Sequence, residues 1–185
     1  QGKPLTLRGQ DLLDVSRFAR GKFALELAPV ETAEILARAI EMASPLLEQR
    51  AHALSVDVPR VGLPMIVDAA RMSQVVGNLL TNAAKYTPPG GAITVSAGRE
   101  GDDVKVTVRD TGIGIAADVL PTVFDLFMQG RQASDRAEGG LGLGLTIVRN
   151  LVERHGGHVL AESEGPGLGS AFSVWVPRAP VLTGR

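Results

Sequence analysis

Apolar residues recur along the chain at two spacings, which separate the predicted helices from the predicted strands. A spacing of three and four residues predicts helices over residues 33–53, 69–86 and 141–155, with a shorter helix near 117–122. Alternation of apolar and polar residues, or a short apolar run, predicts strands over residues 54–58, 64–67, 92–99, 104–110, 157–164 and 170–177. Helices gathered on one face of a mixed, mostly antiparallel sheet would give an α+β fold, a two-layer α/β sandwich.

The predicted helix over residues 69–86 carries a polar stripe. At about 100° per residue, a set of polar residues falls within about 80° of one another; the set is Arg71, Gln74, Asn78, Asn82 and Lys85. Asparagine is a poor residue for a helix interior, and the stripe contains no acid. A recessed face with neutral oxygen ligands and a cation would suit a hydrated Mg²⁺ ion that arrives with phosphates. A plain solvated helix surface is the alternative.

A carboxylate stands at the end of the predicted strand over residues 104–110. Asp110 begins the sequence DTGIGI, in which Gly112 and Gly114 allow backbone to approach a flat ligand closely. An aspartate in such a place can accept a hydrogen bond from an exocyclic amine such as that of adenine. The alternative is an ordinary Asp-Thr-Gly turn.

Glycine-rich backbone precedes the last predicted helix, in the sequence GGLGLGL over residues 139–145. The unpaired N–H groups and the positive dipole end of a helix start form a natural cradle for phosphate. The sequence matches neither the dinucleotide-binding fingerprint nor the Walker P-loop. A flexible linker is the alternative, although the leucines between the glycines favour packed backbone.

With these segments in this order, the chain resembles the catalytic ATP-binding domain of sensor histidine kinases, which belongs with the gyrase, mismatch-repair and heat-shock chaperone ATPases. The resemblance covers residues 12–177. The N-box is matched by Asn78 and Asn82, the first glycine box by Asp110, Gly112 and Gly114, the F-box by Phe124 and Phe127, and the second glycine box by Gly140, Gly142 and Gly144. The segments 85–91 and 123–130 also look like those of hybrid kinases, which carry a receiver domain.

The resemblance implies ATP and Mg²⁺ as ligands and assigns roles to individual residues. Asn82 would ligate Mg²⁺ with Asn78 beside it, Lys85 would meet a phosphate, Tyr86 would lie against the purine, and Asp110 would read the adenine amine. Asn78 and Lys85 would be the catalytic residues. The further nucleotide-binding residues expected are Gly112, Gly114, Ile115, Phe127, Gly140, Leu141, Gly142, Leu143, Gly144, Leu145 and, through water, Ser170. Residues 128–140 would form a lid, in which Arg131 or Arg136 would reach the γ-phosphate.

The residue at position 78 separates two activities within this superfamily. Relatives that hydrolyse ATP carry a glutamate there as a general base, and an amide such as that of Asn78 cannot take a proton from water at neutral pH. Phosphoryl transfer depends mainly on orientation and charge stabilisation, so the resemblance favours a kinase over a hydrolase. The alternatives are a nucleotide-binding regulatory module related to anti-sigma serine kinases and a domain that acts only as a scaffold.

The chain has three histidines, and none has the sequence context of a phosphate acceptor. We expect His52, His155 and His158 to be structural, and the acceptor to lie on a dimerisation domain outside this chain. Residues 1–30 are expected to be an appendage that includes the end of the second dimerisation helix and a linker. Residues 31–178 would then be the catalytic domain and 179–185 a tail, and this fragment would not phosphorylate itself.

Composition narrows the classes of partner. Among 185 residues, 44% are hydrophobic and 21% charged, which is typical of a globular domain. The net charge of −1 favours neither nucleic acid nor a membrane surface as partner. The absence of cysteine excludes disulfides and fits a cytoplasmic domain. The expected partners are ATP, the dimerisation domain that carries the acceptor histidine, and, indirectly, the receiver domain of a response regulator. Phe172 and Trp175 are expected to be core residues.

Overall fold

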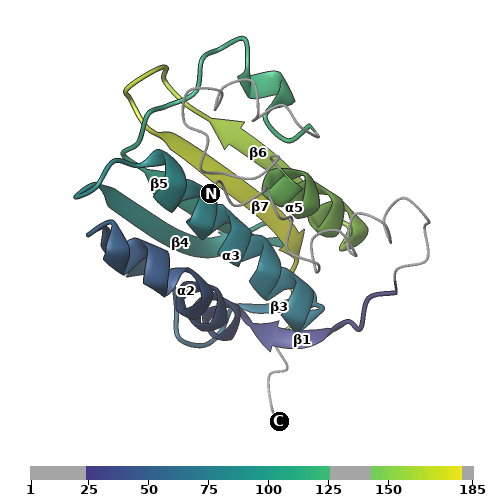
Figure 1. Cartoon of the computed structure of the whole chain (residues 1–185). Coiled ribbons are helices and arrows are strands. Elements are labelled where there is room, and N and C mark those ends of the chain that lie inside the picture. Colours follow the sequence, from purple (N-terminus) through teal and green to yellow (C-terminus); the bar gives the residue numbers. More distant parts are fainter. Residues whose placement is uncertain (1–23, 126–142, 181–185) are drawn as a thin grey trace, which may run out of the picture.

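A five-stranded mixed sheet forms one layer of the computed structural model, which describes residues 24–125 and 143–180 (Figure 1). The strands are β2 (Ala53–Asp57), β4 (Ala92–Glu100), β5 (Asp103–Asp110), β7 (Ser170–Pro177) and β6 (His158–Glu162), in that spatial order. Strands β2 and β4 run parallel, whereas each other neighbouring pair is antiparallel. The prediction of a mixed, mostly antiparallel sheet is therefore confirmed.

Three helices cover one face of this sheet (Figure 1). They are α2 (Thr32–Gln49), α3 (Ala69–Tyr86) and α5 (Leu143–Arg154). Valines that alternate along the strands point toward these helices, and Val95, Val106 and Val174 are each no more than 1% exposed. The fold is thus the predicted α+β sandwich. Among the described residues, no helix has both the length and the apolar character that a membrane crossing requires.

Helix α3 lies between the other two helices and contacts both of them. The carboxylate of Asp68 caps its first turn by accepting a hydrogen bond from the backbone N–H of Arg71 at 3.1 Å. Its buried side includes Val76, Leu79 and Leu80, each no more than 1% exposed. The predicted amphipathic character of this helix is confirmed.

A second, two-stranded sheet pairs the predicted strand over residues 64–67 with a strand that was not predicted. Strand β1 (Ala28–Glu31) pairs antiparallel with β3 (Pro64–Val67), so residues assigned to a linker form ordered structure. The sequence APVE shows no alternation of its own, and strand formation here depends on a distant partner: Ala28 pairs with Val67 and Glu31 with Pro64. The carboxylate of Glu31 also accepts hydrogen bonds from the backbone of Gly62 and Leu63, at 3.2 and 3.1 Å.

Two predicted helices are shorter in the structure than the sequence pattern indicates. Helix α2 continues through Pro45 but ends at Gln49, before the predicted end at residue 53. The chain turns there through Ala51, whose φ of 53° lies in the left-handed region. The short helix predicted near 117–122 is a single 3₁₀ turn, η1 (Leu120–Thr122).

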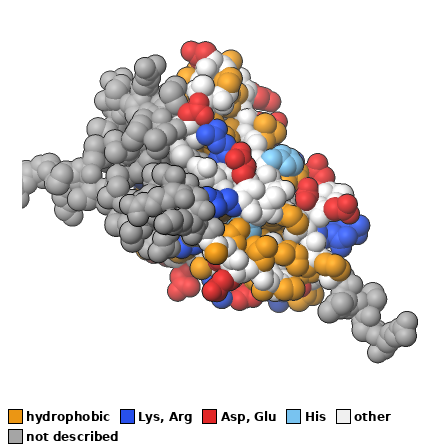
Figure 2. Space-filling model, turned by 90° about the vertical axis from the view of Figure 1, so that its right-hand side faces the viewer, with side chains coloured by type: hydrophobic (Ala, Val, Ile, Leu, Met, Phe, Trp, Pro, Cys, Tyr) orange, Lys and Arg blue, Asp and Glu red, His pale blue; other side chains and the backbone are white. Residues whose placement is uncertain are grey.

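The side of the sheet that faces away from the helices carries Trp175. Phe172 lies in the core at 2% exposure, as expected, but Trp175 is buried on the opposite face. Residues three apart in a strand point to opposite faces. His158 stacks on the Trp175 ring at 4.4 Å, and the Lys105 ammonium lies 5.0 Å from the ring centre. Figure 2 shows charged side chains of both signs interspersed with hydrophobic ones over the described surface in that view.

Candidate functional site

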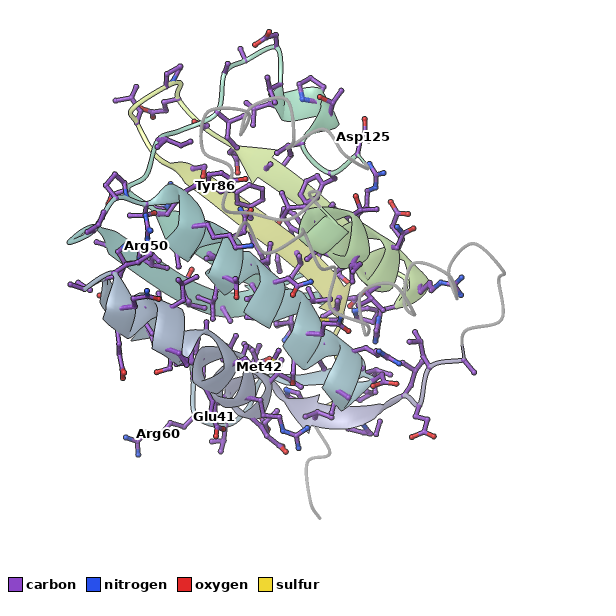
Figure 3. The ribbon with its side chains drawn as sticks, in the orientation of Figure 1. Glu41, Met42, Arg50, Arg60, Tyr86 and Asp125 are labelled. Carbon is purple, nitrogen blue, oxygen red and sulfur yellow. The ribbon has the colours of Figure 1, made fainter. Side chains whose placement is uncertain are left out.

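A pocket opens where the C-terminal end of α3 meets the end of β5 and the start of β7. The space along its lining, open solvent included, amounts to about 350 Å³. Its lining comprises Asn82, Tyr86, Asp110, Ile113, Gly114, Ile115, Val123, Ser170 and Phe172. Figure 3 labels Tyr86 at the C-terminal end of α3. The pocket therefore joins residues from the predicted N-box helix, the first glycine box and the last strand.

Asp110 is a buried carboxylate in the wall of this pocket. It is the last residue of β5 and is only 5% exposed. The Ser170 hydroxyl donates to its Oδ2 at 2.8 Å, and the backbone N–H of Gly112 donates to its Oδ1 at 2.9 Å. Burial raises the pKa of Asp110 above its ordinary value, while these hydrogen bonds act in the opposite direction. The side chain is thus an acceptor held in a fixed orientation.

The first glycine-box loop is seated directly on the end of α3. The backbone N–H of Ile113 donates to the carbonyl oxygen of Tyr86 at 3.0 Å. A Cβ at Gly112 would clash with that same carbonyl oxygen, and it would lie 2.8 Å from Oδ1 of Asp110. Glycine is therefore required at position 112 by the close approach of the loop to the helix.

The loop between β6 and β7 supports the first glycine box from the other side. The N–H groups of Gly167 and Gly169 donate to the carbonyl oxygens of Ile113 and Gly112, at 2.6 and 3.1 Å. Gly114 has a φ of 70°, and a Cβ there would clash with the backbone of Gly165. This contact was not predicted, although the glycine-rich run over residues 165–169 is a signal in the sequence.

The polar stripe of α3 divides between the pocket and the helix that follows the second glycine box. Asn82 and Tyr86 line the pocket. Asn78 lies outside the lining, and its Nδ2 donates to the backbone carbonyl of Gly144 at 3.3 Å. Lys85 is exposed and also outside the lining. Asn78 thus connects α3 to the first turn of α5.

Several residues predicted to contact the nucleotide do not line the pocket or lie outside the described residues. Helix α5 begins at Leu143, and Leu145 is a core side chain at 1% exposure, so only its backbone could meet a ligand. Gly112 supports the pocket without lining it. The residues predicted at Phe127, Arg131, Arg136, Gly140, Leu141 and Gly142 lie outside the described residues.

Three lining residues were not predicted as contacts: Ile113, Val123 and Phe172. Phe172 could have been found, because it alternates with Ser170 in β7 and must share its face. Phe124 of the predicted F-box packs edge-on against Phe172, with ring centres 5.9 Å apart. The Thr146 hydroxyl donates to the carbonyl of Phe124 at 3.0 Å, which joins this wall to α5.

The side chains of the site offer few donors to a metal ion in the described residues. Over residues 24–125 and 143–180, no group of three or more His, Cys, Asp and Glu side chains could hold a metal. Helix α3 offers the side-chain amide oxygens of Asn82, in the lining, and of Asn78, one turn away and outside it. Such a set suits Mg²⁺ that keeps its waters and arrives with phosphate oxygens, rather than an ion held by protein alone.

Comparisons with known proteins agree with this geometry. Residues 67–180 match the family model described as histidine kinase-, DNA gyrase B-, and HSP90-like ATPase. The chain is 35% identical over 175 residues to the circadian input-output histidine kinase CikA of Synechococcus elongatus. It is 39% identical over 168 residues to the sensor protein DivL of Caulobacter vibrioides. These alignments cover 93% and 90% of this chain but 23% and 21% of those longer proteins.

A solved structure of full-length ShkA in complex with AMPPNP superposes with a TM-score of 0.80 at 29% sequence identity. The match covers 93% of this chain and 35% of that chain. Fold, pocket position and sequence similarity therefore lead to one assignment. The chain belongs to the histidine kinase-, DNA gyrase B- and HSP90-like ATPases, as an ATP-binding catalytic domain of the kind found in two-component sensor histidine kinases.

Proposed function

We propose that this domain binds Mg²⁺-ATP in the described pocket and donates the γ-phosphate to a histidine on a separate dimerisation domain. The observation that carries the proposal is the buried carboxylate of Asp110, fixed by Ser170 and Gly112 in a pocket that Tyr86 also lines. A carboxylate oxygen can accept more than one hydrogen bond. Asp110 can therefore accept from the exocyclic amine of adenine while it keeps its protein partners.

The triphosphate would extend from this pocket along α3 toward α5. Asn82 lies on that path as the ligand for Mg²⁺, with Asn78 beside it, and Lys85 on the same stripe would meet a phosphate. The first four N–H groups of a helix have no partner within the helix, so the start of α5 at residues 143–145 offers donors to phosphate. The bound Mg²⁺ would neutralise phosphate charge, and the chain's own residues would orient the nucleotide.

Transfer is favoured over hydrolysis by the residue at position 78. The Asn78 amide cannot serve as a general base for water, and its Nδ2 already donates to Gly144. The acceptor can instead bring an imidazole nitrogen that attacks the γ-phosphorus, while ADP leaves with the bridging oxygen. In-line transfer of this kind needs orientation and charge stabilisation rather than a protein base.

The acceptor would come from another domain, because the three histidines of this chain are engaged elsewhere. His52 bonds backbone carbonyls, His155 is 5% exposed, and His158 stacks on Trp175. A dimerisation domain with the acceptor histidine is therefore the proposed partner, a receiver domain is the indirect one, and the cytoplasm is the proposed location. An anti-sigma type serine kinase is the second candidate, but the similar proteins named above favour the first.

A reconstituted transfer assay tests this proposal. Mixed with separate dimerisation domains of related kinases and γ-labelled Mg²⁺-ATP, the chain should label histidine on the added domain. Asp110→Asn should raise the ATP concentration needed for half-maximal labelling roughly 10- to 150-fold, because a hydrogen bond to a charged group is worth about 1.5–3 kcal/mol. An unchanged ATP requirement would exclude the adenine role of Asp110. Label on serine would favour the second candidate.

A further inference from the structure

We propose that Arg50 and His52, at the end of α2, are positioning residues for the adenine side of the pocket. They bond the backbone carbonyls that follow α3, and they thereby fix the end of α3 on which Tyr86 lies. Neither residue lines the pocket. The inference rests on the proposed nucleotide-binding function and adds a part of the chain that neither the sequence motifs nor the pocket includes.

The two side chains converge on one carbonyl. Arg50 Nη2 donates to the oxygen of Thr87 at 3.2 Å. His52 Nε2 lies 2.9 Å from the same oxygen and 3.1 Å from the oxygen of Pro88. Because both partners are carbonyl acceptors, Nε2 must carry a proton and donate. Figure 3 shows Arg50 at the end of α2 that lies beside the C-terminal end of α3.

Charge favours this arrangement. Thr87 is the C-cap of α3 and is fully buried. The C-terminal end of a helix carries a partial negative charge, so a guanidinium placed there stabilises the helix end. Within α3 itself, Lys85 supplies the basic residue of the last turn. Arg50 adds a second cation from another helix and therefore ties α2 to α3 at this end.

The turn at Ala51, between Arg50 and His52, has a left-handed backbone conformation. Ala51 is the one non-glycine residue with positive φ in the described parts of the chain. Such a conformation is unfavourable for a residue with a Cβ, although helices often end with one. Three backbone hydrogen bonds hold it: Ala51 N to Glu48 O at 3.0 Å, His52 N to Leu47 O at 3.0 Å and Gly90 N to Arg50 O at 3.0 Å. The bonds to Glu48 and Leu47 form the common left-handed end of a helix, and they fix the direction in which the chain leaves α2.

The residue that Arg50 and His52 both bond, Thr87, is next in sequence to a residue of the pocket wall. Thr87 directly follows Tyr86, whose side chain lines the pocket and whose carbonyl accepts from Ile113 N–H at 3.0 Å. Ile113 also lines the pocket. If the carbonyls of Thr87 and Pro88 lose their donors, the last turn of α3 can shift and carry the bonded backbone of Ile113 with it. Tyr86 and Ile113 would then move together.

The chain offers a local probe for this shift, because Tyr86 is its one tyrosine. Labelling with 3-fluorotyrosine gives a single fluorine signal from the pocket. In the Arg50→Ala/His52→Ala variant we expect that signal to move or broaden. Its affinity for Mg²⁺-ATP should fall by roughly 2- to 12-fold in all, no more than the loss of one direct hydrogen bond to the ligand would cause. Arg50→Lys, which keeps a donor, should stay close to the unsubstituted chain.

Arg38→Ala is the matched control, since Arg38 is an exposed residue of α2 paired with Glu34 at 3.1 Å. It should leave both the fluorine signal and the affinity unchanged. Affinities are compared below the unfolding temperature of each variant, and Arg50→Gln replaces the double variant if the latter does not fold. An unchanged signal and affinity, or a loss of stability alone, would overturn the positioning role. Failure of the unsubstituted chain to bind Mg²⁺-ATP would instead reject the proposed function.

Discussion

Helix α3 is held at each end by a histidine from another element, and the two histidines bond in opposite senses. At the N-terminal end, His155 of the segment after α5 accepts from the backbone N–H of Asp68 at 3.1 Å through Nε2. Its Nδ1 donates to the carbonyl of Leu151 at 2.7 Å. At the C-terminal end, His52 donates to the carbonyls of Thr87 and Pro88. The His155 ring must be neutral for its Nε2 to accept, whereas the His52 ring donates through its Nε2.

The two ends of α3 are therefore expected to serve different purposes, one nucleotide binding and the other stability. The residues of α3 that line the pocket, Asn82 and Tyr86, lie toward its C-terminal end. The N-terminal end holds Asp68, whose carboxylate accepts from the backbone of Arg71 and of Glu26 at 3.1 and 3.0 Å. Changes at the C-terminal end should therefore alter nucleotide affinity, and changes at the N-terminal end should alter the free energy of unfolding alone.

Among the substitutions that compare the two ends of α3, the largest effect on affinity is expected from Gly112→Ala. The added Cβ would meet the carbonyl oxygen of Tyr86, which is backbone and cannot rotate away, so the loop must leave its seat on α3. We expect ATP affinity to fall roughly 10- to 100-fold, the cost of misplacing a binding group by about 1 Å. Unfolding should become easier by about 1–3 kcal/mol. Calorimetry and thermal unfolding measure both quantities.

Gly98→Ala is the matched control for this substitution. A Cβ at Gly98, in β4, would meet no atom within 4 Å. It should leave ATP affinity unchanged. If Gly112→Ala binds ATP as tightly as Gly98→Ala, the loop does not set the pocket and the comparison between the two ends of α3 fails.

A smaller effect is expected from Asn82→Ala, which tests the metal side of the same end. The chain should still bind ATP, but Mg²⁺ should no longer tighten that binding, which lowers affinity in Mg²⁺ by about 5- to 10-fold, near the low end of typical coupling between two ligands. Titration with and without Mg²⁺ separates the two contributions. Gln74→Ala, nearer the N-terminal end of the same stripe, should keep the Mg²⁺ dependence. A persistent dependence in Asn82→Ala would reject the ligand role.

The sequence could predict those features that depend on local periodicity. Short residue spacings indicate the amphipathic α3, its Asp68 cap and the strand that ends at Asp110. The structure contains each of them. Features set by distant partners could not be predicted in this way. Strand β1 exists because of β3, and the hydrogen bonds of His52 and His155 join residues 35 and 87 positions apart.

The sheet face on which Trp175 lies could have been predicted from the sequence. Trp175 and Phe172 are three positions apart in β7, so alternation alone places them on opposite faces of the sheet. The same rule puts Phe172 beside Ser170 in the pocket wall. The contact of the β6–β7 loop with the first glycine box could not be predicted in this way. It depends on the register of two strand pairs, β5–β7 and β6–β7.

The smallest effect on affinity is expected at the N-terminal end of α3, from His155→Gln. Glutamine removes the titrating group but keeps a carbonyl acceptor, so nucleotide affinity should stay within about twofold and stability at neutral pH should fall by about 1 kcal/mol. Burial lowers the pKa of His155, against opposing effects of its bond to Leu151 and of the charge on Asp68. The unfolded chain therefore binds the proton more readily than the folded one.

Stability from a neutral buried histidine is full above the unfolded pKa of about 6.5 and is lost as the pH falls from there toward the lower pKa of the folded state. The free energy of unfolding should therefore decline more steeply between neutral and mildly acidic pH in the unsubstituted chain than in His155→Gln. Denaturant unfolding at several pH values measures the two slopes. Equal slopes would show that Nε2 of His155 does not need to stay unprotonated. A loss of ATP affinity comparable to that of Gly112→Ala would mean that both ends of α3 control binding.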